Sequence, residues 1–231
     1  MFHKVKFGIS EAFEMAYDIA TSKKGSDSIW LAQRHGVKQV TAWLFRRKIQ
    51  ESMKSSEKYP LEKTVHVDEF EIVTPKKGEQ GRSQSKSKIR IVLAVEIRGN
   101  KPGRAYAKVI EDYSCKSLTP IFETHIKSDA NIVTDKWSGY KPLKNNFPQL
   151  TQELSDSGAN FKVLHFQIRN FKNWQRGVHS YCAKEYINQY IQEYFLRFNR
   201  LNFRETILEK LLIKMCLEKP MTYKSIKSVA T

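Results

Sequence analysis

The sequence predicts a mixed α/β protein in which a small all-helical module precedes a core built on a mixed β-sheet. Apolar residues over 9–52 recur at helical spacing and are interrupted by glycine-containing turns. From residue 65 the pattern changes to three strand-like stretches in succession, followed by a helical stretch and a further strand. From about residue 167 the chain becomes helical again. We therefore expect an α+β core whose sheet contains both antiparallel and parallel strands.

Length, charge and composition exclude several classes of protein. The chain has 231 residues, with 40 Lys and Arg against 24 Asp and Glu, a formal net charge of +16 and a pI near 9.7. Hydrophobic residues make up 40%, too many for a disordered chain. No apolar run approaches the ~18 residues that a membrane span needs, and the opening MFHKVKF lacks the apolar stretch of a secretory signal. We expect a cytoplasmic protein.

The three cysteines, Cys115, Cys182 and Cys216, lie far apart and form no CxxC pair. This spacing argues against a zinc finger or ribbon within this chain and offers no disulfide framework. We expect each cysteine to be a small buried hydrophobe in a reducing compartment.

Residues 1–58 have the outline of a helix-turn-helix module. After a first helix, Gly25 breaks the pattern and Ser26 or Asp27 can cap a short second helix, SIWLAQRH. That helix ends at Gly36, a residue suited to the left-handed conformation, and a longer basic helix, VTAWLFRRKIQESM, follows. Unless this basic run is only a solvated face, its candidate DNA contacts are Lys38, Gln39, Thr41, Arg46, Arg47 and Lys48.

The charge is unevenly distributed, since both ends of the chain are strongly basic while residues 65–159 are nearly balanced. A polyanion held by the flanks and processed in the middle would produce this pattern, because phosphate contacts supply sequence-independent affinity. The alternative is a basic soluble protein without a nucleic-acid ligand.

The core is expected over residues 65–200, after a linker at 59–64 and before a helical tail at 201–231. Strands are expected at TVHVDEFEIV, KIRIVLAVEIRG, GRAYAKVIEDY and NIVT, with the helix CKSLTPIFETHIK before the last of these and a fifth short strand at KVLHF (162–166). The intervening stretch TPKKGEQGRSQSKSK is typical of a basic loop.

Two aspartates are placed to meet within this core. Asp68 lies in the first strand and Asp135 ends the fourth, and in an RNase H-like sheet these strands are neighbours. Two carboxylates that share a site repel unless divalent cations neutralise them, and two such ions suit phosphodiester chemistry. Either aspartate alone would more often be a cap or turn residue. Glu69 should point to the opposite face of the strand from Asp68, so we assign it a supporting or structural role, and Glu71 shares that face.

Four strings, VHVDEFEI, IVTDKWSGY, LHFQIRNFKNWQRGVHS and IQEYFLRFNR, resemble the transposases of bacterial insertion sequences with an ISXO-like DDE domain. The segment TSKKGSDSIWLAQRHGVKQVTAWLFRRKIQESM is similar to the helix-turn-helix region of that group. The resemblance covers nearly the whole chain. It implies an RNase H-like catalytic core that cuts and joins transposon DNA ends with Mg²⁺ or Mn²⁺, two ions being expected.

Carried over by position, the resemblance makes Asp68 the first acid, Asp135 the second and Asn170 the third catalytic and metal-binding residue. An asparagine carbonyl can ligate a hard cation but brings no charge. In a regular helix Asn170 and Lys172 are about 200° apart, so Lys172 is expected to contact phosphate. The same phosphate role is open to Arg169, Arg176 and His165, although His165 is also expected to be a supporting or structural histidine at a strand end.

The resemblance implies double-stranded DNA, both transposon ends and target, as the partner and a homodimer or larger assembly on DNA, close to the bacterial nucleoid. No small-molecule substrate is expected. Trp137 and Tyr140 would stack on an unpaired base or pack in the core. Two alternatives stay open: an RNase H-like nuclease that does not join strands, and an inactive or truncated DNA-binding relative, since the zinc ribbon common in this group is not found in this chain.

Overall fold

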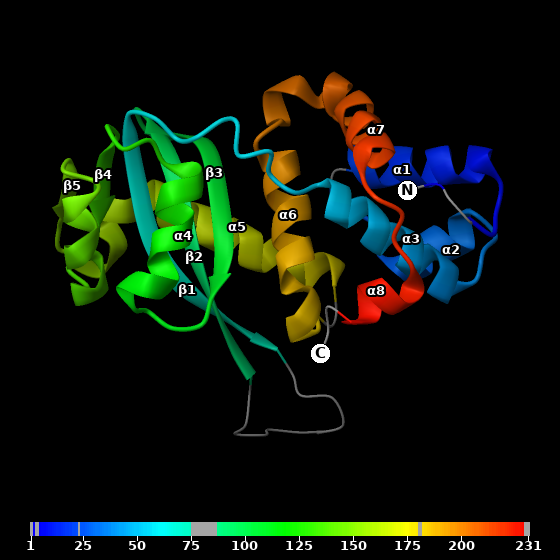
Figure 1. Cartoon of the computed structure of the whole chain (residues 1–231), viewed down its shortest axis with the longest axis horizontal. Helices are drawn as coiled ribbons and strands as arrows, with labels where there is room; N and C mark the ends of the chain where they lie inside the picture. The colour runs from blue at the N-terminus through cyan, green and yellow to red at the C-terminus, as the bar shows by residue number, and fades with distance from the viewer. Residues whose placement is uncertain (1, 3–4, 23, 75–86, 180–181, 229–231) are drawn as a thin grey trace. The chain divides into compact units, whose positions relative to one another are not determined.

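The structure, a computed structural model, describes residues 2, 5–22, 24–74, 87–179 and 182–228. It divides into two compact units (Figure 1). Residues 56–173 form the sheet unit, and residues 1–55 together with 174–231 form the helical unit. Most of the predicted basic loop, residues 75–86, lies outside the described residues. Over the described ranges, no helix combines the length and apolarity needed to cross a membrane.

The sheet unit is built on a five-stranded mixed sheet in the order β3-β2-β1-β4-β5. Its first three strands are antiparallel neighbours, whereas β4 pairs in parallel with both β1 and β5. This arrangement confirms the predicted α/β, RNase H-like fold. The strands are β1 (Thr64–Thr74), β2 (Ser87–Arg98), β3 (Lys101–Ile110), β4 (Asn131–Thr134) and β5 (Leu150–Gln152); α4 (Cys115–His125) crosses from β3 to β4, and two 3-10 helices, η1 (Ser138–Asn145) and η2 (Asp156–Phe161), follow.

Helices cover both faces of this sheet. Successive side chains of a strand point to opposite faces, so β1 supplies apolar residues to the packing on each side. Val65 and Val67 point to one face and share a buried cluster with Leu118 and Phe122 of α4. On the other face, Phe70 meets Phe171 of α5 (Lys162–Val178), with ring centroids 5.9 Å apart. Asp68 lies in the same alternation as Phe70, so it faces α5.

The predicted fifth strand at 162–166 is wrong. These residues open α5, and the fifth strand is instead β5, whose Leu150 pairs with Ile132. The reason is the period of the buried positions, since Leu164, Ile168 and Phe171 follow helical spacing on the side that meets the sheet. The short apolar run VLHF is ambiguous between a strand and a helix when taken alone.

The helical unit confirms the three predicted N-terminal helices. The side chain of Asp27 starts α2, because its Oδ1 accepts hydrogen bonds from the backbone N–H groups of Ile29 and Trp30. Gly36 ends it at φ +60°, the left-handed conformation that glycine tolerates. The helices of this unit are α1 (Ile9–Thr21), α2 (Ser28–Arg34), α3 (Gln39–Ser52), α6 (Ile187–Phe198), α7 (Ile207–Leu217) and α8 (Tyr223–Ser228), with 3-10 turns η3 (Lys184–Tyr186) and η4 (Leu201–Thr206).

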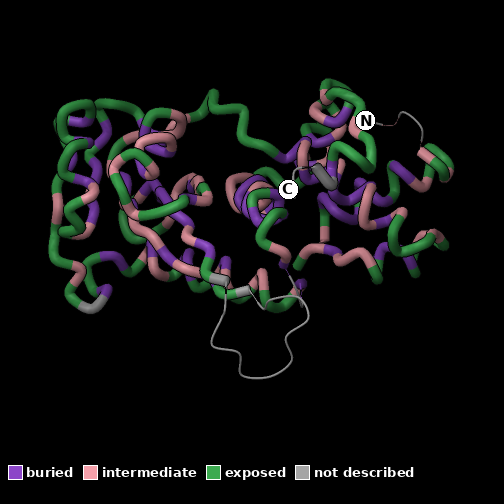
Figure 2. Tube along the Cα trace, turned by 60° about the horizontal axis from the view of Figure 1, so that its bottom comes forward, coloured by how far each residue is buried: buried purple, intermediate pink, exposed green. Residues whose placement is uncertain are grey.

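The core of the helical unit combines residues of the N-terminal helices with residues of α7; Figure 2 shows which parts of the trace are buried. Ala16 of α1 and Ile49 of α3 share one buried cluster with Leu211 and Met215 of α7, all at most 1% exposed. The division of the chain therefore differs from the predicted boundaries of 1–58, 65–200 and 201–231. The physical reason is that α7 is an amphipathic helix whose apolar side completes the N-terminal core, so it is not a separate tail.

Candidate active site

The pairing of β1 with β4 brings the two predicted acids together. The strands run parallel, and Val67 is opposite Thr134 in the register. Asp68 and Asp135 are the next residues along each strand, so their Cα atoms are neighbours although the residues are far apart in the sequence. The charge of Asp135 contributes to a raised pKa of Asp68, which agrees with this placement.

The Asp68 carboxylate is held by hydrogen bonds at both of its oxygens. Oδ1 accepts from the backbone N–H of Glu69 at 2.8 Å, and Oδ2 lies 3.0 Å from Nε2 of His165. The side chain is 21% exposed. Burial raises the pKa of Asp68, with the Asp135 charge adding to the rise and the hydrogen bonds from His165 and Glu69 opposing it. The site therefore holds a half-buried carboxylate that is oriented and costly to ionise.

Asp135 is oriented by the turn that follows β4. Its Oδ1 accepts the backbone N–H of Trp137 at 3.0 Å, and its backbone carbonyl accepts from Nε2 of Gln152 at 3.0 Å. Gln152 belongs to β5, so the neighbouring strand fixes the backbone that carries the second acid.

Glu69 points to the other face of β1, as predicted, where it meets Tyr140 of η1. Burial raises the pKa of Glu69 to about 7; the Tyr140 phenol opposes this rise, and the charges of Asp68 and Asp135 add to it. Tyr140 is fully buried in the α4-side cluster, which excludes it from stacking on a base. Trp137 is 47% exposed, with its indole N–H donating to the carbonyl of Tyr113.

His165, rather than Asn170, is the α5 residue that the structure places beside Asp68. Asn170 follows five residues later, about 140° around the helix, and none of the hydrogen bonds in the described part of the chain joins it to either aspartate. Lys172 returns to the His165 side, and its Nζ lies 5.3 Å from the centre of the Phe70 ring. The expectation of His165 at a strand end is wrong, because α5 has already begun at Lys162.

A glycine makes room for the His165 ring. Gly158 in η2 has φ +90°, and a Cβ there would lie 2.4 Å from Nδ1 of His165. Sequence reasoning missed this pair. The signal in the sequence was the helical spacing of apolar residues over 162–178. That spacing predicts a helix in which His165 lies next to the buried face.

The donor set fits a hard divalent cation. Asp68 and Asp135 offer carboxylate oxygens, the ligands that Mg²⁺ or Mn²⁺ prefers, whereas the imidazole nitrogen of His165 is a softer donor. Across the ranges that the structure describes, no group of three or more His, Cys, Asp or Glu closes around one metal position. A cation here would therefore complete its shell from water and substrate phosphate, as Mg²⁺ usually does. Its charge would also favour ionisation of Asp68.

The predicted DNA contacts on α3 separate into two groups. Arg46 and Arg47 are each 2% exposed and are hydrogen-bonded inside the helical unit, so the expectation that they form an exposed DNA-binding face of α3 is wrong. Their period on α3 turns them toward α6 instead of solvent. Lys38 and Gln39 at the start of α3 are exposed, whereas Thr41 and Lys48 are half-buried; on α5, Arg169 and Arg176 are exposed.

The comparisons with known proteins place the chain in a family. Residues 60–199 match the model of the ISXO2-like transposase domain. A crystal structure of a pre-cleavage Mos1 transpososome is similar at 10% identity and a TM-score of 0.37, covering 91% of this chain and 79% of that chain. The Mos1 mariner paired end complex with Mn is similar at 9% identity and a TM-score of 0.35, covering 89% of this chain and 78% of that chain. No curated protein matches. Because the family match spans more than half of the chain, including the whole sheet and α4 to α6, this protein belongs to the ISXO2-like transposase domain family.

Proposed function

We propose that this chain cleaves DNA at the ends of an insertion sequence and joins those ends to target DNA, with Asp68 and Asp135 as its catalytic carboxylates. The observation that carries the proposal is the parallel register of β1 and β4, because it makes Asp68 and Asp135 neighbours on adjacent strands. His165 is the third member in place of Asn170, because its Nε2 lies 3.0 Å from Asp68.

The chain's residues would prepare the site before DNA binds. The Glu69 N–H and His165 set the direction of the Asp68 carboxylate, and the Trp137 N–H sets that of Asp135. Bound Mg²⁺ or Mn²⁺, two ions by our expectation, would neutralise the phosphodiester charge and lower the pKa of the attacking water or 3′-hydroxyl. His165 in its neutral form can donate from Nε2 to Asp68 or, with its proton on Nδ1, present a lone pair as a ligand.

The reaction is a pair of in-line displacements at phosphorus. Water attacks the phosphodiester at the end of the element and releases a 3′-hydroxyl, and that hydroxyl then attacks target DNA and displaces the 3′-oxygen of the broken strand. Two ends have to be held together for this sequence, so we expect a dimer or larger assembly on double-stranded DNA.

The test is strand transfer by a labelled duplex that carries the element's own end, with Mg²⁺, with Mn²⁺ and with EDTA. We expect joined products only with metal, and a loss of at least 100-fold in Asp68→Asn and Asp135→Asn without loss of DNA binding. Asp129→Asn, which alters an exposed carboxylate between α4 and β4, is the matched control. Near-normal joining by either active-site variant would remove that aspartate from the mechanism. Metal-dependent cutting without joining would identify a nuclease, and binding without cutting would identify an inactive relative.

His165 and Asn170 are separated in the same assay. We expect His165→Ala to lower the rate of joining at least tenfold, because it removes a partner of Asp68, and Asn170→Ala to change it less than twofold. The opposite ranking would return the third position to Asn170.

A further inference from the structure

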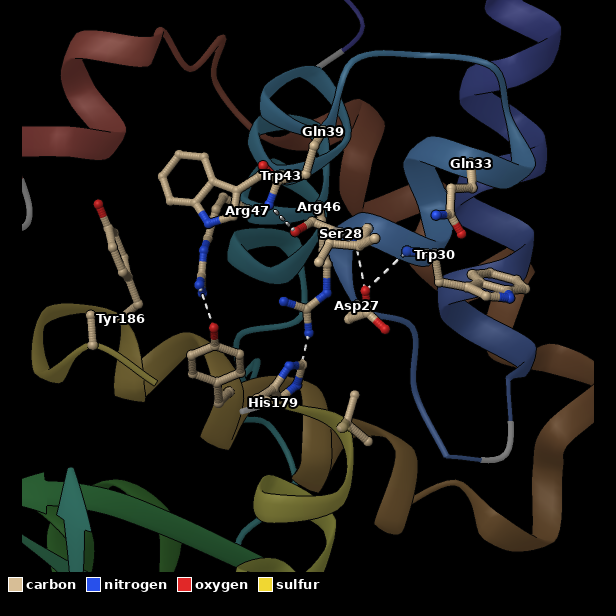
Figure 3. Close-up of a pocket in the computed structure, with 14 residues that line it drawn as sticks. Asp27, Ser28, Trp30, Gln33, Gln39, Trp43, Arg46, Arg47, His179 and Tyr186 are labelled. Atoms are coloured by element: carbon tan, nitrogen blue, oxygen red, sulfur yellow. Dashed lines mark hydrogen bonds between the residues drawn. The ribbon is translucent and has the colours of Figure 1, made fainter. Parts of the chain in front are cut away.

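The helical unit contains a pocket of about 630 Å³ between α2, α3 and the residues around the start of α6 (Figure 3). Its size is within the range of small-molecule sites. It shares no residue with the carboxylate site. Those of its lining residues that carry the argument are Trp30, Gln39, Trp43, Arg46, Arg47 and Tyr186.

The floor of this pocket carries more positive than negative buried charge. Arg46 and Arg47 are each 2% exposed, and the only fully buried carboxylate that they meet in the described residues is Glu193, 2.6 Å from Nη2 of Arg46. His179 does not add a charge, because burial and the two guanidinium groups lower its pKa to about 2. Nε of Arg46 and Nε of Arg47 are buried without a hydrogen-bond partner in the described part of the chain.

The other acids near the pocket do not balance this charge. Asp27 at the mouth is engaged as the cap of α2, with one oxygen accepting two backbone N–H groups. Glu51 accepts from Gln189 and pairs with Lys54. Arg197, close enough to His179 to lower its pKa, adds a further positive charge. A buried excess cation is costly unless an anion joins it, so the pocket is suited to an anionic group.

Aromatic rings surround the same cations. The Arg47 guanidinium lies 4.4 Å from the Tyr186 ring centre and 5.3 Å from that of Trp43. Trp43 and Tyr186 meet edge to face at 5.5 Å, and Trp30 at the rim is 41% exposed. The Gln39 amide donates to the hydroxyl of Ser28 at the mouth. Planar rings, an amide and an unbalanced guanidinium pair are together the chemistry that recognises a base and its phosphate.

We propose that this pocket binds one unpaired nucleotide, with its phosphate toward Arg46 and Arg47 and its base against Trp43. The nucleotide can come from a frayed or single-stranded DNA end or from a free mononucleotide, and the same chemistry serves both. The inference does not depend on catalysis at Asp68, since the pocket belongs to the helical unit alone.

The experiment uses the full chain and 2-aminopurine, a base whose fluorescence falls when it stacks. Three probes are compared: a duplex with 2-aminopurine in a short unpaired 3′ extension, the same duplex with the base paired, and free 2-aminopurine deoxynucleoside monophosphate. We expect the fluorescence of the unpaired extension to be quenched on binding. Trp43→Leu should bind that probe at least tenfold more weakly than wild type, and Trp43→Phe should restore the affinity. Phe203→Leu, which changes a 60% exposed aromatic of the helical unit outside the pocket, is the control.

Competition by the free monophosphate would identify a mononucleotide site, and failure to compete would identify a DNA strand as the source; both support the proposal. Equal binding by Trp43→Leu and wild type, or full competition by inorganic phosphate alone, would overturn it. Because metal is absent from these measurements, Asp68→Asn binds the probes as wild type does, and a failure of strand transfer leaves this result unaffected.

Discussion

At the scale of single residues, the candidate active site depends on how the His165 imidazole is held. Its Nε2 faces Asp68, and its Nδ1 side lies over Gly158, where a side chain would collide with the ring. Gly158 is also in the left-handed region, at φ +90°, where glycine is favoured. One glycine thus sets both the backbone turn and the position of a site residue.

We expect Gly158→Ala to lower the rate of strand transfer by tenfold or more, because a shift of His165 by about 1 Å is enough to misplace Asp68. The change is followed by the NMR titration of the His165 imidazole as well as by the rate. Gly177→Ala on α5, where a Cβ meets nothing within 4 Å, is the matched control. An unaltered His165 titration in Gly158→Ala would contradict this account.

His179 makes the stability of the helical unit depend on pH. Its pKa is lowered from 6.5 to about 2 in the folded chain by burial and by Arg46 and Arg47. Below about pH 6.5 the unfolded chain takes up a proton at His179 and the folded chain does not. The free energy of unfolding therefore falls by about 1.4 kcal/mol for each pH unit below that value, and it is independent of this group above it. We expect urea unfolding of His179→Gln to lose less stability than wild type between pH 7 and pH 5, as the glutamine does not titrate. Parallel pH profiles would show that His179 is protonated when folded.

At the scale of secondary-structure elements, the two faces of α3 have different roles. Its buried side carries Arg46 and Arg47 into a polar network with α6, where Gln189 and Tyr190 accept from Arg47. Its start leaves Lys38 exposed. A run of basic letters on a helix therefore does not by itself indicate a DNA-binding face.

The packing of α7 against α1 and α3 should contribute to the stability of the helical unit. Leu211 is 1% exposed and packs in the cluster of α1 and α3, whereas Leu217 on the same helix is 80% exposed. We expect Leu211→Ala to lower the free energy of unfolding by about 2–5 kcal/mol and Leu217→Ala to change it by at most about 0.5 kcal/mol. Urea denaturation followed by circular dichroism measures both. Equal costs would mean that α7 does not complete this core.

At the scale of the whole molecule, the formal net charge of +16 is the property that favours DNA as a partner. Only charges that are free to meet phosphate contribute to binding. Lys38 is exposed, while Lys127 is already paired with Glu62 at 2.7 Å. The DNA affinity should therefore depend on the first of these lysines more than on the second.

Filter binding of a duplex over a range of salt concentrations tests this ranking. We expect Lys38→Gln to weaken binding and to reduce the slope of log affinity against log salt by about 1, and Lys127→Gln to leave the slope unchanged. A slope that does not respond to Lys38→Gln would assign the start of α3 to solvent.

Much of the architecture was predictable because the signals are local. The alternation in VHVDEFEI and the apolar run IVLAV predict strands, and both are present. Asp27 and Gly36 predict the limits of α2 through their side chain and backbone preferences. The strand at 162–166 was mispredicted because four apolar-rich letters satisfy either period, and contact with the sheet decided for helix.

The sequence by itself determined the order of strands and helices, the basic character of the chain, and the placement of one aspartate within the first strand and of the other at the end of the fourth. These depend on residue types and spacing, which act over a few positions. Only the tertiary structure decided that His165 meets Asp68, that Arg46 and Arg47 are buried, and that α7 joins α1. Each of these depends on which face of a helix packs against a distant segment, and the free energy of that burial is shared among residues far apart in the chain.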